Sequence, residues 1–140
     1  MDPSADCVVV FSGTNDFGHG NGWLGVLEDR DEYTFYGALH TLILLLLDRY
    51  PDRRIVFITP LHRLTEDETT NDEIGLCRAK LIEYVKAIRE VCAYYSIPVI
   101  DLYETSGIQP EVEIMPDGLN PNDDGAILLA EHVEAGLHHL

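Results

Sequence analysis

Amide, imidazole and carboxylate side chains follow three separate apolar runs of this sequence, close to where each run ends. Asn15 comes after the first run, His62 after the second and Asp117 after the third. Such groups donate and accept hydrogen bonds, and an imidazole also carries a proton, so they are suitable components of a polar binding or catalytic site. Because ligands bind beyond the carboxyl ends of parallel strands, the three groups are expected to converge on one site.

Three strands are expected to position these groups, near residues 7–12, 55–59 and 98–102. Each is a short apolar run rich in β-branched residues, which is typical of parallel strands covered on both faces. Three strands make a small sheet, since the mean sheet has about five to six.

Helical patterns lie between and after these strands. Asp31 is expected to cap a helix that runs to about Tyr50, and Thr70 with Glu73 forms a capping box for a helix that ends near Tyr95. A stripe of apolar residues marks a final helix, namely Ala126, Ala130, Val133 and Leu137. Strands that alternate with helices predict one α/β domain over residues 1–140, with a mainly parallel sheet.

The first long helix is apolar on more than one face. Leu44 projects on the side opposite Phe35, and Leu45 and Leu47 flank it. A helix on the surface of a globular protein usually has a single apolar face. The second apolar surface is therefore expected to be covered.

Two short motifs resemble two of the four sequence blocks of the SGNH, or GDSL-type, esterase and lipase family. They are Gly13-Thr14-Asn15-Asp16 and Asp117-Gly118-Leu119-Asn120-Pro121-Asn122. The Thr59-Pro60 pair and the Val99-Ile100-Asp101-Leu102 run fit the same family. The resemblance implies a flavodoxin-like, three-layer αβα fold, truncated so that it corresponds to roughly the C-terminal two-thirds of an SGNH hydrolase.

The resemblance also implies roles for individual residues. Asn15 takes the place of the amide that donates to the oxyanion, a contact generally worth about 10²–10³ in rate. Asp117 takes the place of the acid that orients the catalytic histidine, and Asn120 stands where that histidine should be. The candidate substrate-binding residues are Gly13, Thr14, His19 and His62, and no metal or cofactor is implied.

Two catalytic parts of the family pattern are missing. The Gly-Asp-Ser block that carries the nucleophile occurs nowhere in the chain, and the amide of Asn120 has no basic nitrogen with which to accept a proton. The resemblance thus implies a carboxylic-ester hydrolase by lineage, for small acyl esters, with little or no activity in this form. The alternative is a non-catalytic remnant that binds a ligand or a partner.

Each candidate residue also has a purely structural interpretation. Asn15 and Asp16 can close a turn, as can Asp117 and Asn120. His19 and His62 can be packing residues at a loop rim. Asn120 to Gly125, followed by Glu131, also nearly fits a calcium loop, but no helix leads into it and an ordinary helix cap at Asn122 or Asp123 explains the same residues.

The amino-acid composition argues against nucleic acids and membranes as partners. The chain has 25 acidic and 9 basic side chains and a formal charge of −16, which opposes binding to nucleic acid and to anionic membranes. Its longest strongly apolar run, Leu42 to Leu47, is too short to span a bilayer. Cys7, Cys77 and Cys92 are odd in number and lack metal-ligand spacing, which indicates reduced thiols in a cytoplasmic protein.

The family resemblance raises one structural expectation. Family members place the nucleophile strand beside the strand equivalent to Val8–Phe11, and that neighbour is absent here. Proteins seldom leave an apolar edge strand bare. We therefore expect a homodimer, or a complementing chain, that covers either this edge or the surface formed by Leu44, Leu45 and Leu47.

Overall fold

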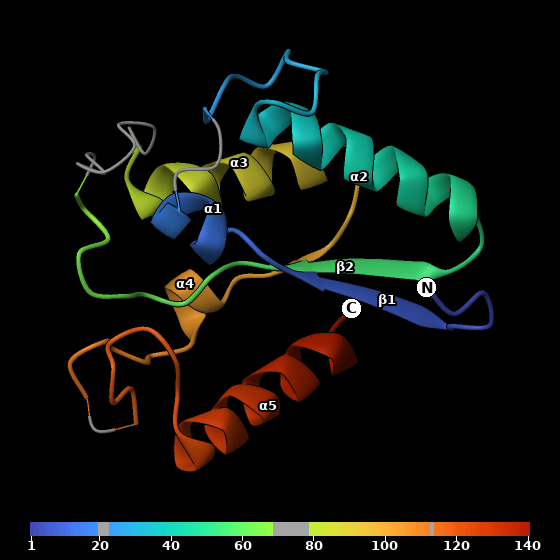
Figure 1. Ribbon diagram of the computed structural model, residues 1–140. Coiled ribbons are helices and arrows are strands. Elements are labelled where there is room, and N and C mark those ends of the chain that lie inside the picture. Colours follow the sequence, from blue (N-terminus) through green and yellow to red (C-terminus); the bar gives the residue numbers. More distant parts are fainter. Residues whose placement is uncertain (20–22, 69–78, 113) are drawn as a thin grey trace.

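A parallel sheet of three strands forms the centre of the protein (Figure 1). The computed structural model describes residues 1–19, 23–68, 79–112 and 114–140. The sheet has the order β1-β2-β3, with β1 at Cys7–Phe11, β2 at Arg54–Ile58 and β3 at Val99–Ile100. Val10 lies opposite Phe57, which in turn lies opposite Val99. The predicted parallel strands are confirmed, although β3 is shorter than expected.

Helices cover both faces of this sheet, so the three-layer αβα architecture is confirmed (Figure 1). On one face, α2 (Phe35–Arg49) and α3 (Leu81–Tyr94) pack over Ile55 and Phe57. On the other face, α5 (Asp123–His138) packs over the side chains that alternate with these. That second apolar layer is formed by Val56, Ile58, Leu61, Ile100, Leu102, Ile108 and Met115.

The start of α2 differs from the expectation. Thr34 is the N-terminal cap, because its hydroxyl accepts from the Gly37 N–H at 3.0 Å. The side chain of Asp31, the predicted cap, instead accepts from the Tyr33 N–H at 2.9 Å and closes a turn before the helix. The helix ends at Arg49, with Tyr50 as its C-terminal cap, close to the predicted end.

The other helices also refine the expectations. The first residue of α3 is Leu81, and the Glu83 carboxylate caps this helix by accepting from the Lys80 N–H at 2.7 Å. The predicted capping residues Thr70 and Glu73 lie outside the described residues. The short helix α4 (Leu102–Thr105) replaces the predicted end of the third strand. It forms because the Asp101 carboxylate accepts from the Glu104 N–H at 3.3 Å.

A short helix, α1 (Thr14–His19), follows β1 where the sequence predicts only a turn and a loop. Gly13 has a φ of 111°, a conformation that glycine adopts more easily than other residues. Its carbonyl accepts from the Phe17 N–H at 3.1 Å and so starts the helix. The strand therefore turns sharply at Gly13 and directs the next residues away from the sheet.

The strand β1 lies at one edge of the described sheet. Its Val9 and Phe11 side chains point away from α2 and α3 and remain 43% and 49% exposed. On α2, Leu44, Leu45 and Leu47 are exposed as well, in agreement with the second apolar surface expected from the sequence. Among the described helices, none is long and apolar enough to cross a membrane.

Candidate functional site

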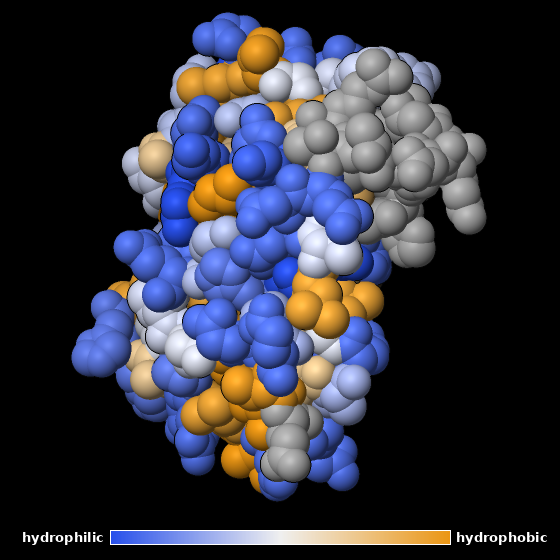
Figure 2. Space-filling model, turned by 90° about the vertical axis from the view of Figure 1, so that its left-hand side faces the viewer, coloured by the Kyte–Doolittle hydropathy of each residue, from blue (hydrophilic) through white to orange (hydrophobic). Residues whose placement is uncertain are grey.

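The loops that follow the strands meet at one end of the sheet, as the sequence predicts. Arg63, in the loop after β2, donates from Nη1 to the Thr14 carbonyl at 2.9 Å and to the Thr14 hydroxyl at 3.2 Å. The next residue, Leu64, donates its N–H to the Gly118 carbonyl at 3.0 Å. This one loop therefore joins the turn after β1 to the turn that carries Asp117. Figure 2 views the molecule from this end and shows a largely hydrophilic face with separate hydrophobic patches.

A cavity of about 180 Å³ lies where two of these turns meet. Its polar groups come from Ser12 and Thr14, which follow β1, and from Asn120, which precedes α5. Apolar side chains make up most of the remaining wall, namely Phe11, Pro60, Leu61, Leu119, Pro121 and Leu129. The structure thus brings two of the predicted site residues, Thr14 and Asn120, to one small and mainly apolar pocket.

Asp117 and Asn120 are held together in a tight turn by two hydrogen bonds, and a third hydrogen bond joins Asp117 to Leu119. Asp117 Oδ1 accepts from the Asn120 N–H at 2.6 Å and from the Leu119 N–H at 2.8 Å, and Oδ2 accepts from Asn120 Nδ2 at 3.1 Å. The Asn120 N–H, with the other two donors, holds the pKa of Asp117 below its ordinary value. The carboxylate is therefore ionised at neutral pH and orients the side chain three residues further along the chain.

Asn15 lies in the first turn of α1 and is exposed. Its side-chain amide makes no hydrogen bond to any part of the chain that the structure describes, and it does not line the cavity beside Asn120. The amide is thus available to a ligand at the same end of the sheet. Its assignment as an oxyanion donor remains a prediction.

Three of the four candidate substrate-binding residues, Gly13, Thr14 and His19, lie in or next to α1 and differ in their surroundings. Gly13 is buried, and a Cβ at this position would lie 3.2 Å from Pro60 Cγ, so its role is to let the turn pass close to Pro60. Thr14 is held by Arg63, whose guanidinium also lies over the Phe17 ring at 5.2 Å from its centroid. His19 ends α1, but its side chain lies outside the described residues.

His62 lies in the loop after β2 and contacts two residues that are not among the predicted site residues, Glu66 and Tyr103. Its Nδ1 lies 2.8 Å from Glu66 Oε1, and its ring stacks on Tyr103 with a centroid distance of 3.9 Å. The second Glu66 oxygen accepts from the Arg63 N–H at 2.9 Å. The four-residue spacing of His62 and Glu66 is a signal in the sequence, but Tyr103 is distant in the chain and no local pattern points to it.

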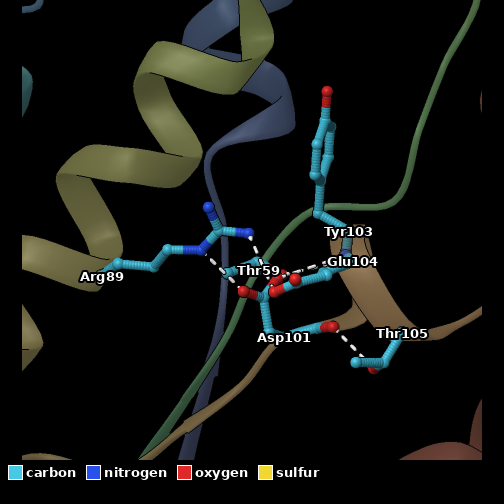
Figure 3. A network of polar contacts seen from close by, with 6 residues as sticks. All are labelled: Thr59, Arg89, Asp101, Tyr103, Glu104 and Thr105. Carbon is cyan, nitrogen blue, oxygen red and sulfur yellow. Dashed lines mark hydrogen bonds and ion pairs between the residues drawn. The ribbon is translucent and has the colours of Figure 1, made fainter.

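A second polar network fixes the end of β3 (Figure 3). The Thr59 hydroxyl donates to Asp101 Oδ1 at 2.9 Å and accepts from the Tyr103 N–H at 3.0 Å. Arg89 on α3 donates from Nε to Asp101 Oδ2 at 2.6 Å. Burial, followed by the charge of Glu66, raises the pKa of Tyr103 to about 12. The network holds Tyr103, and with it one face of the His62 ring, in a fixed position.

The calcium-like segment has a structural role in the described chain. The side-chain oxygen of Asn122 accepts from the Gly125 N–H at 2.9 Å and caps α5, as the ordinary interpretation of this segment expects. Within the described ranges, no three His, Cys, Asp or Glu side chains gather in a way that would hold a metal ion. The polar groups that the structure describes at this end of the sheet are amide, hydroxyl, carboxylate, imidazole and guanidinium groups.

Comparisons with known proteins agree with this geometry. The sequence profile of the GDSL-like Lipase/Acylhydrolase family matches residues 1–127. One crystal structure, 39% identical, has a TM-score of 0.88 and matches all of this chain and 67% of its own. A Lactobacillus plantarum protein, 28% identical, has a TM-score of 0.87 over 99% of this chain and 69% of its own.

A possible lipase from Chitinophaga pinensis shares the fold at 23% identity, with a TM-score of 0.74 over 96% of this chain and 73% of its own. A comparison with curated proteins finds no match. The profile match covers most of the sequence, and a solved relative is well above 30% identical over the whole chain. This α/β domain therefore belongs to the GDSL-like lipase and acylhydrolase family.

Proposed function

We propose that this chain is a carboxylic-ester-binding member of its family with little or no hydrolysis by the serine route. The observation that carries the proposal is the contact of Asn120 with Asp117. An acid and an orienting geometry are retained there, but the side chain that Asp117 holds is an amide, which cannot take a proton from a hydroxyl group.

The missing groups matter because the members of a catalytic triad act as a unit. Removal of one member commonly costs about as much as removal of all of them. The chain also lacks the Gly-Asp-Ser block, and Ser12 lies between the end of β1 and the turn at Gly13 rather than at the start of a helix. An oxyanion donor such as Asn15 can then bind an ester carbonyl without completing the reaction.

The ligand class follows from the cavity beside Asn120. Pockets for drug-sized ligands have volumes of about 300–1,000 Å³. The volume of about 180 Å³ found here suits a short acyl group. The apolar wall accommodates the alkyl part, and the hydroxyl and amide groups of Ser12, Thr14 and Asn120 can bond an ester or acid oxygen.

Serine chemistry is tested by labelling with a fluorophosphonate probe, alongside p-nitrophenyl acetate hydrolysis by the wild type and by Ser12→Ala and Asn120→Ala. We expect no stoichiometric label and no loss of rate in either variant. Stoichiometric labelling of any serine, or loss of hydrolysis in Ser12→Ala, would contradict the proposal.

Ligand binding is tested separately by NMR titration with butyrate and with methyl butyrate. Leu119→Trp fills the cavity from its rim and is expected to abolish the shifts of the cavity residues. Leu128→Trp is the matched control, because Leu128 lies on α5 outside the cavity lining. Equal binding by both variants would remove the cavity as the binding site.

A second candidate function, partner binding, is favoured by the edge strand. We propose that β1 pairs with β1 of a second copy, antiparallel across a two-fold axis centred on Val9. In this register Phe11 lies opposite Cys7 of the partner subunit, a large side chain against a small one, on the exposed face of the strand. Cys7 and Leu47 line a common cavity, so the open edge continues onto the exposed apolar surface of α2.

We also propose a cytoplasmic location. The support is that Cys7, which is exposed, and Cys92, which is buried, are both free thiols in the described structure. Fractionation of the source cells, with the protein detected by antibody, tests the location. Recovery from the secreted fraction would contradict it.

A further inference from the structure

The imidazole of His62 is fixed by two contacts, and one of the two contacting side chains, Glu66, is itself held in place. Nδ1 lies 2.8 Å from Glu66 Oε1, the ring stacks on Tyr103 at an interplanar angle of 27°, and Glu66 is itself held by the Arg63 N–H. The two side chains of the pair are 27% and 18% exposed. A carboxylate that is itself positioned and that orients an imidazole is the arrangement by which proteins prepare a histidine for reaction.

The contact with Glu66 also decides which nitrogen of His62 can react. An ionised carboxylate only accepts hydrogen bonds, so neutral His62 places its proton on Nδ1 and donates it to Glu66. The lone pair is then on Nε2, for which the described part of the chain offers no hydrogen-bond partner. The reactive nitrogen is therefore both basic and open to a ligand.

Other histidines of the chain are held differently. His40 is fully buried, with Nδ1 2.7 Å from the Tyr95 hydroxyl and Nε2 2.8 Å from the Leu27 carbonyl, so both nitrogens are engaged. His138 also has a glutamate four residues away, Glu134, but at 3.7 Å, and the two side chains are 76% and 74% exposed. His138 thus offers a matched control with the same spacing and no fixed geometry.

We propose that His62 is a nucleophile that cleaves carboxylic esters with a good leaving group, such as aryl esters, independently of the cavity beside Asn120. Nε2 attacks the carbonyl carbon, a C–N bond forms, and the C–O bond to the leaving group breaks to release a phenolate. The acylated ring keeps its Nδ1 proton, and its positive charge lies beside the Glu66 carboxylate. Water then attacks the acyl carbon, the C–N bond breaks and a carboxylic acid leaves. The second proton of the water goes to the phenolate or to solvent, so that His62 is neutral again with its proton on Nδ1.

Glu66 and Tyr103 have supporting roles in this step. Glu66 is a positioning residue that keeps the proton on Nδ1 and compensates the positive charge formed on the ring. Tyr103 stays neutral through the working pH range, because its pKa is about 12. It stacks on the ring, and its hydroxyl donates to Glu66 Oε1 at 3.3 Å, the same oxygen that lies beside His62 Nδ1. The other charged groups that act on Tyr103 are Asp67 and Arg89, which have opposite signs.

The activity is tested with p-nitrophenyl acetate at several pH values. The wild type, His62→Gln and His138→Gln are compared, with circular dichroism to confirm folding of each. We expect His62→Gln to lose most of the rate above buffer and His138→Gln to retain it. The wild-type rate should rise as an imidazole loses its proton. Equal rates for wild type and His62→Gln, or an equal loss in both variants, would overturn the proposal.

The role of Glu66 is tested by Glu66→Gln and by nitrogen-15 NMR of the imidazole. A glutamine amide can donate to Nδ1 and so shift the proton of His62 to Nε2, where it blocks attack. We expect the NMR spectrum to report the Nδ1–H form in the wild type and the Nε2–H form in the variant, with loss of rate. An unchanged tautomer together with an unchanged rate would refute the positioning role.

The proposed reaction also predicts a covalent intermediate, in which the acyl group is attached to His62. Acid quenching of the reaction, followed by mass spectrometry, should find an acetyl group on the peptide that contains His62 and not on the peptide that contains His138. An adduct on Ser12 instead would contradict both this inference and the proposed lack of serine chemistry. Label confined to His62 supports the inference and leaves the proposed lack of serine chemistry intact.

Discussion

The Nδ2 atom of Asn120 donates to Oδ2 of Asp117 at 3.1 Å, while two backbone N–H groups of the same turn bond the other carboxylate oxygen. A carboxylate with one oxygen used by the backbone and one by the side chain three residues later forms a ready-made orienting group. The turn is fully formed although the side chain at position 120 is an amide. This turn is therefore a suitable site at which to introduce a base.

Asn120→His is predicted to place an oriented imidazole beside Asp117. The introduced ring replaces the amide as the donor to Asp117 Oδ2, and the carboxylate favours its charged form. The pKa of the introduced imidazole should therefore lie above the ordinary value of about 6.5, as measured by NMR titration. In the double variant with Asp117→Asn, the pKa should return toward that value, and an equal pKa in the two proteins would show that the contact is not formed.

Acid sensitivity is predicted from the lowered pKa of Asp117. Because its folded-state pKa lies below the unfolded value of about 3.9, Asp117 contributes stability at pH values above the unfolded pKa. That contribution is lost as the pH falls through the folded-state pKa. The difference in free energy of unfolding between wild type and Asp117→Ala should therefore shrink below about pH 4, and urea unfolding at pH 7 and at pH 3 measures it.

Asp101→Asn is predicted to destabilise the fold more than Glu104→Gln does. Asp101 is 19% exposed and bonds Arg89, Thr59 and the first turn of α4, so its loss should cost about 1–3 kcal/mol. Glu104 is 72% exposed and lies 3.7 Å from Arg89, an ion pair worth about 0–1 kcal/mol. Urea unfolding tests the order of the two effects, provided that the dependence of the free energy of unfolding on urea concentration is the same in all proteins. An equal decrease in the free energy of unfolding in the two variants would contradict the prediction.

Phe11→Cys is predicted to cross-link the proposed dimer. In the register centred on Val9, the introduced thiol lies opposite Cys7 of the partner subunit, at the spacing of cross-strand neighbours. Two symmetric disulfides should form per dimer under oxidising conditions. Val10→Cys is the control, because Val10 packs toward α2 and α3. A monomer by light scattering in about 1 M NaCl, where the screening length is about 3 Å, would exclude the dimer.

Salt is predicted to stabilise the protein. The formal charge of −16 on 140 residues means that like charges repel one another in the compact state, and added salt screens this repulsion. The midpoint of thermal unfolding should rise from low salt to about 1 M NaCl. Charge reversal of exposed acidic residues, Asp48→Lys, Glu68→Lys and Glu131→Lys combined, should reduce the rise, and a midpoint independent of salt would refute the argument.

The sequence predicts the architecture because its strongest signals are long-range periodicities. The β-branched runs predict the strands, and the predicted end of α2 near Tyr50 is within one residue of the observed last residue, Arg49. Local choices between similar residues are not decided by periodicity. Asp31 and Thr34 are both good caps, and the choice depends on Phe35 N–H bonding the Trp23 carbonyl, a contact between segments that no local pattern contains.

In the candidate site too, contacts within one turn are predictable from the sequence, whereas contacts between distant segments are not. The four-residue Asp117 to Asn120 motif predicts that these two side chains meet, because the contact lies within one turn. The cavity beside Asn120 could not be predicted, since Phe11 and Leu129 come from opposite ends of the chain. The setting of the His62 ring likewise depends on Tyr103, whose position is fixed by the Thr59 hydroxyl and not by its own neighbours in sequence.

The double role of Thr59 has a consequence for the sheet itself. Only two residue pairs join β2 and β3, the second being Ile58 with Ile100, and the Thr59 N–H donates to the Ile100 carbonyl at 3.2 Å. Beyond that point the threonine hydroxyl takes one hydrogen bond from the Tyr103 N–H and gives one to Asp101, as a peptide group of a longer strand would do. The Thr59 side chain thus extends the hydrogen bonding at the end of the two strands. Serine would preserve these two hydrogen bonds, whereas valine, which has the same shape as threonine, would remove them.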